Sequence, residues 1–201
     1  MDEIVKSPQH ITTMIQSDLL KRENILWAGQ PESTLLNNKD FFFIPFTVVW
    51  TGIAMFSLLS ALVKHNQLSL FTFCFVSPLV LMVLLGLYAV FGRFIYKSWK
   101  KRNTYYIVTN QRILVLSMVP SRSLQAVFIN QLTTIKQSLN SRGIGSIMFG
   151  NSSIGDKMYG NTGMEVFDVL GQVQWVPAFY DIKDANTVYQ LISNLQNEST
   201  G

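Results

Sequence analysis

The sequence predicts an α+β membrane protein, in which a two-helix transmembrane hairpin precedes a β-sandwich or open barrel of about seven strands. Two long apolar runs with almost no charge predict the hairpin. Short β-rich segments separated by Gly, Asn and Ser predict the sheet domain, and apolar residues at helical spacing predict a C-terminal helix that closes it.

The apolar runs lie between Phe41 and Phe91, where Lys64 is the only charged residue. They predict helices at residues 41–63 and 68–91, since roughly 20 residues suffice to cross a bilayer core. Charged residues are 14% of the chain, against roughly 25% in soluble domains. A buried hairpin in a soluble protein is the alternative, and the length of two consecutive runs argues against it.

Charge bias predicts the orientation of the hairpin. The link at residues 64–67 is short, so the helices are expected to be antiparallel neighbours whose outer flanks share one compartment. The flanks carry Lys39 and a basic cluster at residues 93–102, whereas the link carries Lys64 alone. Both termini are therefore expected to be cytoplasmic, and the opening Met1-Asp2-Glu3 shows no cleavable signal.

Three segments follow from this division: a cytoplasmic segment with a short helix at residues 1–40, the hairpin and basic segment at 41–103, and a domain at 104–201. Residues 1–103 hold ten Lys and Arg against six acids, whereas residues 104–201 hold six of each. The domain thus lacks the charge excess typical of nucleic-acid binding. We expect the basic segment to contact anionic lipid headgroups non-specifically, through Arg93, Tyr96, Lys97, Trp99, Lys100, Lys101 and Arg102.

The domain opens with a β-hairpin, in which strands at residues 105–109 and 112–117 flank the turn Asn110-Gln111. Glycine, Asn and Ser predict a long loop at residues 150–163. The C-terminal helix is expected to bury a stripe from Ile182 to Leu195, with Asp181 or Asp184 capping its first turn. Further strands are expected at residues 123–129, 133–138, 144–149, 164–170 and 172–176.

Four segments of the chain resemble bacterial membrane-associated proteins with a pleckstrin-homology-like (PH-like) domain beside a pair of transmembrane helices. ENILWAGQP at residues 23–31 is similar to the family pattern E-x-x-x-W-x-G-x-P, and YIVTNQRI at 106–113 to its Y-x-(I/V/L)-T-(N/D)-x-R hairpin. GIGSIMF at 143–149 and FYDIKDANTV at 179–188 resemble its glycine-rich strand and its helix entry. The family-motif residues are Trp27, Gly29, Pro31, Tyr106, Thr109, Asn110, Arg112, Gly143, Gly145 and Phe149.

The resemblance implies a PH-like fold on the inner (cell) membrane of a bacterium. Packing and turn geometry explain most of the motif residues without any ligand. Phosphoinositide binding needs several Lys and Arg around the first hairpin, and this hairpin supplies only Arg112. That residue is therefore a weak candidate for a lipid contact.

Catalytic chemistry is not expected. The two histidines, His10 and His65, and the single cysteine, Cys74, assemble no triad or zinc set, and no P-loop is present. Asp156, Glu165 and Asp168 are acids of the kind that usually lie on the solvated surface. We expect no catalytic residue, metal or cofactor.

The remaining hypothesis is a non-enzymatic, membrane-anchored interaction or scaffold module whose domain contacts a protein partner or copies of itself. An accessory subunit of a larger membrane enzyme or transporter complex is the alternative, with the hairpin as its contact surface. A lipid-sensing module is a second alternative, with Arg112 as the first candidate contact.

Overall fold

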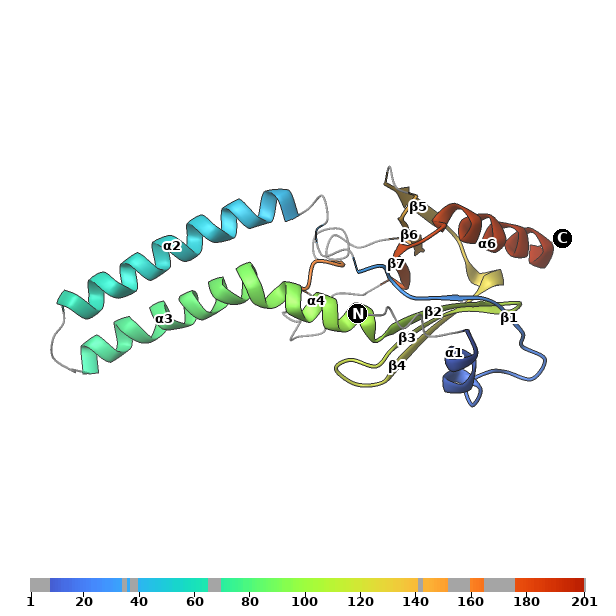
Figure 1. The fold of residues 1–201 in the computed structure, drawn as a ribbon, viewed down its shortest axis with the longest axis horizontal. Helices are drawn as coiled ribbons and strands as arrows, with labels where there is room; N and C mark the ends of the chain where they lie inside the picture. Colours follow the sequence, from blue (N-terminus) through green and yellow to red (C-terminus); the bar gives the residue numbers. More distant parts are fainter. Residues whose placement is uncertain are drawn as a thin grey trace. The chain divides into compact units, whose positions relative to one another are not determined.

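The computed structural model describes residues 8–33, 36, 40–64, 70–140, 143–151, 160–164 and 176–200. This part of the chain is α+β, with two antiparallel sheets and two long apolar helices (Figure 1). The chain divides into two compact units. We call residues 1–34, 98–158 and 170–201 the globular unit, and residues 35–97 and 159–169 the helical unit.

The globular unit contains a four-stranded sheet in the order β1-β2-β3-β4 and a three-stranded sheet in the order β5-β6-β7. All neighbouring strands are antiparallel. The strands are β1 (Ile25–Gly29), β2 (Thr104–Thr109), β3 (Arg112–Ser117), β4 (Ser123–Phe128), β5 (Ile135–Leu139), β6 (Gly145–Phe149) and β7 (Ala178–Ile182).

The predicted hairpin is confirmed, because Val108 pairs with Ile113 across the turn Asn110-Gln111. The strands expected between residues 105 and 149 correspond to β2 to β6. Those expected at 164–170 and 172–176 lie almost wholly outside the described residues. In their place the described part contains β1 and β7, which the sequence did not predict as strands. The seven described strands are divided between two sheets.

Both faces of β2 are buried, and this explains its uninterrupted apolar sequence. Tyr106 and Val108 point into a core shared with Phe179 and Ile192. Their neighbours Tyr105 and Ile107 point to the opposite face, where side chains of helix α1 (Pro8–Ile15) join a second core. The N-terminal segment is therefore part of the globular unit.

Helix α6 (Ala185–Thr200) closes the first core with Ala185, Val188 and Ile192, as its periodicity predicted. The helix begins later than expected. Ile182 is the last residue of β7, and the carboxylate of Asp181 pairs with Lys101 at 2.5 Å. Of the two acids expected at the start of the helix, Asp181 therefore belongs to a strand and pairs with a buried cation. Asp184 directly precedes α6, and its carbonyl accepts from the Thr187 and Val188 amides.

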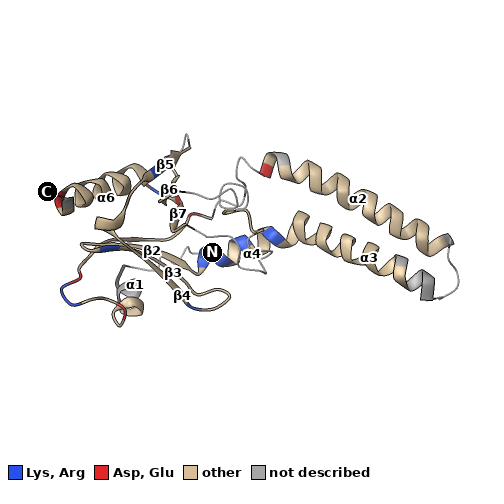
Figure 2. Ribbon diagram, turned by 180° about the vertical axis from the view of Figure 1, so that it is seen from behind, with Lys and Arg blue, Asp and Glu red and all other residues tan. Residues whose placement is uncertain are grey.

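The helical unit contains α2 (Asp40–Lys64) and α3 (Leu70–Leu87), which lie side by side (Figures 1 and 2). They agree with the predicted helices, except that α3 continues through a π-helical turn, η1 (Tyr88–Gly92), into α4 (Arg93–Arg102). Two segments, Phe43–Val63 and Val76–Arg102, are long and apolar enough to cross a membrane. The link predicted at residues 64–67 lies outside the described residues after Lys64.

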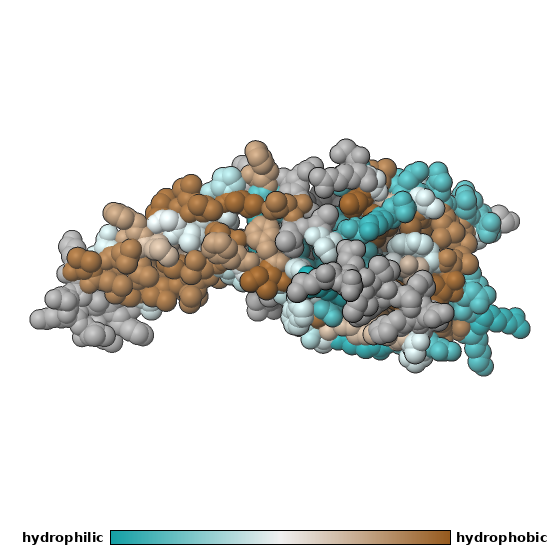
Figure 3. Space-filling model, viewed as in Figure 1, coloured by the Kyte–Doolittle hydropathy of each residue, from teal (hydrophilic) through white to brown (hydrophobic). Residues whose placement is uncertain are grey.

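Small residues form the contact between α2 and α3. A Cβ atom on Gly86 of α3 would lie 2.3 Å from Oγ1 of Thr51, so only glycine fits there. The Thr51 hydroxyl donates to the Thr47 carbonyl at 2.6 Å, which satisfies it within α2. Large apolar side chains face outward instead, with Phe41 and Phe56 exposed by 88% and 73% (Figure 3).

Candidate functional site

The basic residues of α4 form the most concentrated positive charge of the described chain (Figure 2). Arg93, Lys97 and Lys101 recur at intervals of four, so they share one face of the helix. That face is buried, with exposures of 1%, 3% and 6%. Each of these three cations pairs with an acid, and the headgroup contact expected for them stays a prediction.

Asp40 supplies the counter-charge within the helical unit. It is the first residue of α2, and its carboxylate lies 2.8 Å from Nη1 of Arg93 and 3.9 Å from Nζ of Lys97. All three side chains are at least nine-tenths buried. One carboxylate thus pairs with two buried cations.

Arg93 has unused donors. Its contact with Asp40 is an ion pair without hydrogen-bond alignment, and Nε and Nη2 have no hydrogen-bond partner within the described structure. The guanidinium carbon lies 4.5 Å from the ring centroid of Phe94, so a cation–π contact covers one face of the group. In-plane acceptors for two donor nitrogens are still needed.

A short segment from the C-terminal half packs beside Arg93. The Tyr88 hydroxyl donates to the Gly163 carbonyl at 2.8 Å. A Cβ on Gly163 would lie 2.4 Å from the Arg93 carbonyl oxygen, and the φ of +82° also favours glycine. Tyr88 begins the π-helical turn η1, and such turns are frequent at functional sites.

Lys101 belongs to the globular unit, and its ammonium has acceptors there. Its Nζ donates to Asp181 at 2.5 Å and to the carbonyl of Glu32 at 3.2 Å. Of the other expected interface residues, Trp99 and Arg102 are exposed, whereas Tyr96 and Lys100 are half-buried. The accessible part of the basic segment is therefore smaller than its composition suggests.

Four of the family-motif residues take part in the packing around Phe179. Tyr106 stacks on Phe179 with ring centroids 4.6 Å apart, Phe149 meets the same ring edge-on at 5.0 Å, and Trp27 lies 5.7 Å away. Gly29 leaves room for the Trp27 ring, which a Cβ would approach to 2.6 Å. These residues form an aromatic cluster around Phe179.

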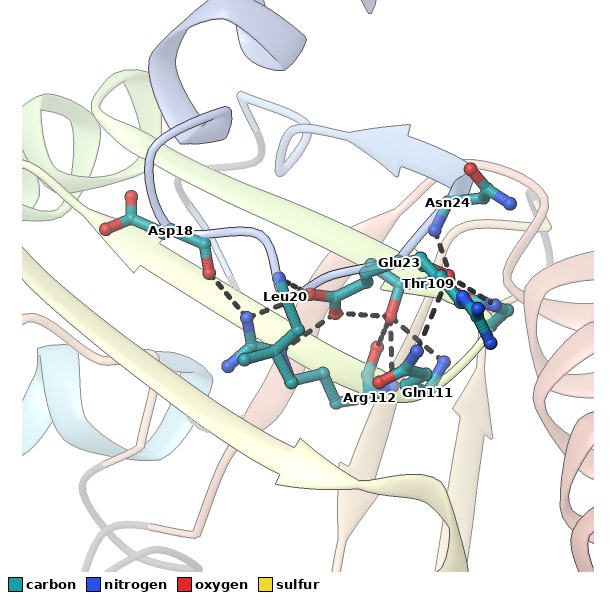
Figure 4. Close-up of polar contacts among 9 residues, drawn as sticks. Asp18, Leu20, Glu23, Asn24, Thr109, Gln111 and Arg112 are labelled. Atoms are coloured by element: carbon teal, nitrogen blue, oxygen red, sulfur yellow. Dashed lines mark hydrogen bonds and ion pairs between the residues drawn. The ribbon is translucent and has the colours of Figure 1, made fainter.

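Arg112 is engaged by Glu23 in a buried, bidentate pair (Figure 4). Nε and Nη2 of Arg112 donate to the two carboxylate oxygens at 2.8 and 2.9 Å. The Leu20 amide donates at 2.6 Å, and the Thr109 hydroxyl lies 2.8 Å from the carboxylate. Burial by itself raises the pKa of Glu23, but the hydrogen bonds from Arg112, Leu20 and Thr109 outweigh it, so the pKa lies below its usual value.

The turn residue Asn110 extends this cluster. Its side-chain oxygen accepts from the Asn24 amide at 2.9 Å, and its side-chain nitrogen donates to the Arg22 carbonyl at 3.2 Å. The hairpin motif therefore anchors the N-terminal segment. Arg112 is engaged by Glu23 in this cluster, and the expectation that it contacts a lipid stays a prediction.

The other motif positions have local roles. Gly145 packs between β5 and α6, where a Cβ would lie 2.5 Å from the Ser138 carbonyl oxygen and 2.9 Å from Ala185. Gly143 adopts a φ of +75°, and Pro31 is half-buried. Cys74 is exposed, and the described residues contain no group of acids, His and Cys suited to a metal. Asp156, Glu165 and Asp168 lie outside the described residues.

Comparison with known proteins assigns no relative: no family model, characterised protein or solved structure matches the chain. The PH-like resemblance therefore stays a prediction. Sequence reasoning missed Asp40 and Glu23, the two acids that pair with the buried arginines. The signal for Glu23 was present as the first letter of the ENILWAGQP motif.

Proposed function

We propose that this chain is a non-enzymatic, membrane-anchored interaction module, in which α2 and α3 cross a bilayer and the globular unit, which we propose to be PH-like, binds a protein partner. The observation that carries the proposal is the burial pattern of the helical unit, which is the reverse of the pattern in the core of a soluble protein. Small residues such as Gly86 lie between the helices while Phe41 and Phe56 face outward. Membrane helices pack in this way, because lipid tails solvate large apolar side chains.

The burial of the helices argues against the soluble alternative. Only 17% and 22% of the two apolar windows are buried, whereas the core helix of a soluble protein is mostly covered. Exposed apolar surface of this extent requires a lipid or protein environment. The arrangement also supports the proposed topology, because a hairpin leaves both flanking regions in one compartment, and positively charged flanks favour the cytoplasm as that compartment.

The globular unit offers sheet edges for a partner. β4 and β5 are end strands of their sheets as described, and Gln125 and Phe128 of β4 are exposed. End strands can add a strand from another chain, which supplies affinity through main-chain hydrogen bonds. This mode needs no net charge, which suits a domain with six basic and six acidic residues after residue 103.

Photo-cross-linking in native membranes tests where the partner binds. A photoreactive residue at Gln125 probes β4, and a matched one at Phe56 probes the exposed face of α2. We expect a discrete protein adduct, or a dimer of this chain, from Gln125 and only lipid adducts from Phe56. Discrete protein adducts from Phe56 alone would overturn the proposal and support an accessory subunit that binds through its hairpin.

A further inference from the structure

We propose that two copies of this chain pair through strand β4, edge to edge and antiparallel, around a two-fold axis that passes between their Ala126 residues. The inference rests on the proposed protein-binding role of the globular unit and names a second copy as its partner. It follows from the unprotected edge of β4, the direction of its main-chain groups and the self-complementarity of its side chains.

Within the described residues, β4 differs from the other three end strands in lacking any feature that blocks pairing with a further strand (Figure 1). Proteins commonly protect end strands with lysines, prolines or bulges. The pairings of β1 and β7 each contain a register shift, and β5 carries the exposed Lys136. In contrast, β4 pairs in continuous register with β3 from Ser123 to Phe128, and it contains no charged residue and no proline.

The hydrogen bonds of the sheet show which main-chain groups of β4 point outward. Opposite residues of an antiparallel pair alternate between hydrogen-bonded and non-hydrogen-bonded pairs. The Ile129 amide donates to the Gln111 carbonyl at 3.0 Å, one position beyond Phe128 in the register of β3 with β4. Phe128 therefore belongs to a non-hydrogen-bonded pair, and so do Ala126 and Leu124. The amide and carbonyl groups of these three residues point away from β3, toward the position of a further strand.

A second copy of β4 matches this edge in register. A two-fold axis at Ala126 places this residue opposite itself in the other copy, and it places Leu124 opposite Phe128. These are the residues with outward main-chain groups, so each opposite pair can exchange two hydrogen bonds. Their side chains also share one face of the sheet, because they are spaced two apart along the strand. The two copies therefore form one continuous sheet without a bulge.

The side chains of β4 favour a second copy as the occupant. Ala126 is exposed and small at the one position where a residue must face itself. Phe128 is a large apolar residue that is 40% exposed, and Leu124 of the other copy would cover it. Cross-strand contacts between apolar side chains stabilise a sheet. Since the strand carries no charge, the axis brings no like charges together.

Disulfide trapping tests the pairing in isolated membranes, with the full chain in a Cys74→Ser background. Ala126→Cys should give a disulfide-linked dimer on mild oxidation, because opposite Cα atoms of a hydrogen-bonded pair lie about 5.5 Å apart, within disulfide range. Ser123→Cys, also exposed on β4, should not, because position 123 lies opposite 129, about six positions or 20 Å from 123 of the other copy. Dimers from neither variant, or equal amounts from both, would overturn the pairing.

A charge on the axis gives a second test that needs no cross-link. Ala126→Lys sets two ammonium groups opposite each other, so it should raise the dissociation constant of the dimer in maltoside micelles by roughly tenfold or more. Ala126→Ser, a small change without charge, should leave it unchanged. Light scattering at several chain concentrations measures the mass. A chain that is monomeric at every concentration, or equal dissociation constants for both variants, would overturn the proposal. If Ala126→Lys does not fold, the disulfide comparison decides.

Failure of the self-pairing is distinguishable from failure of the proposed function. A photoreactive residue at Gln125 that cross-links a different protein, with no disulfide dimer from Ala126→Cys, removes only the second copy as the partner. Discrete protein adducts from Phe56 alone would contradict the proposed function, and the self-pairing with it.

Discussion

The two units of the chain bury opposite kinds of side chain. The globular unit places large residues such as Phe179 and Ile192 inside, whereas the helical unit places Gly86 and Thr51 inside and leaves Phe56 outside. Water drives the first arrangement, because burial removes apolar area from it. The second arrangement is the one expected of helices surrounded by lipid tails, so the contrast is what the proposed membrane anchoring predicts.

Each unit also contains a buried arginine, and the two differ in their hydrogen bonds. Arg112 donates to both oxygens of Glu23, and further donors complete the carboxylate. Arg93 contacts Asp40 but retains two nitrogens without an acceptor in the described structure. The Glu23–Arg112 pair is thus hydrogen-bonded through both oxygens, whereas the Asp40–Arg93 pair is an ion pair with two unsatisfied arginine nitrogens in the described structure.

The largest effect on stability is expected from breaking the ion pair between Glu23 and Arg112. Glu23→Ala leaves the Arg112 guanidinium buried without its acid and should lower the free energy of unfolding by about 3–5 kcal/mol. Urea unfolding of the full chain in micelles, followed by tryptophan fluorescence, measures this loss. Glu32→Ala, which removes the side-chain partner of the exposed Lys183, should cost about 1 kcal/mol or less. Similar losses in both variants would remove the distinction between buried and exposed pairs.

Truncating a large side chain in the core of the globular unit tests one side of this contrast. Ile192→Ala should lower the free energy of unfolding by about 2–5 kcal/mol, because this side chain of α6 is fully buried in the core that contains Phe179. Asn186→Ala, on the exposed side of the same helix, should change it by about 0.5 kcal/mol or less. The same unfolding assay compares them, and equal tolerance would contradict the packing of α6.

The sequence predicted the elements whose signals are local. The turn Asn110-Gln111 lies between two apolar strands, so β2 and β3 could be placed from nearby residues, and the lengths of the apolar runs indicated α2 and α3. β1 was missed because its partner β2 lies far along the chain. β7 was interpreted as a helix entry, because Ile182 continues the apolar spacing of α6.

The candidate site was only partly predictable for the same reason. The basic residues of α4 were evident from composition, but the pairing that buries them depends on Asp40 and Asp181, which are distant in sequence. The π-helical turn η1 and the contact between Tyr88 and Gly163 have no local signal. Residue type indicated a cationic surface, and tertiary pairing decided which cations face inward.

A smaller effect is expected at the contact between α2 and α3. Gly86→Ala places a Cβ against the Thr51 hydroxyl, so overpacking should destabilise the hairpin by about 1–3 kcal/mol. Gly52→Ala adds the same atom where no neighbour lies within 4 Å and should be neutral or slightly stabilising. Melting of the full chain in micelles, followed by helical circular dichroism, compares the pair. A harmless Gly86→Ala would mean that the helices do not pack through this contact.

The smallest effect is a pH dependence from Glu23. Its pKa is lowered in the folded state, so the stabilisation is present above the unfolded pKa and is lost as pH falls through the folded pKa. Stability of the unaltered chain should decline on acidification in that window, and Glu23→Gln should show a shallower decline. Parallel pH profiles for the two chains would contradict the lowered pKa.

The central claim is that α2 and α3 cross a membrane as a hairpin. The most direct test measures which side of the membrane the link between them and helix α6 face. In a Cys74→Ser background, single cysteines replace Asn66 in the link and Asn197 on the exposed side of α6. A membrane-impermeant thiol reagent on intact cells should label the cysteine at 66 but not the one at 197, and permeabilised cells should label both. Labelling of neither position in intact cells but both after permeabilisation would contradict a membrane-crossing hairpin, and strong labelling at 197 in intact cells would contradict its orientation.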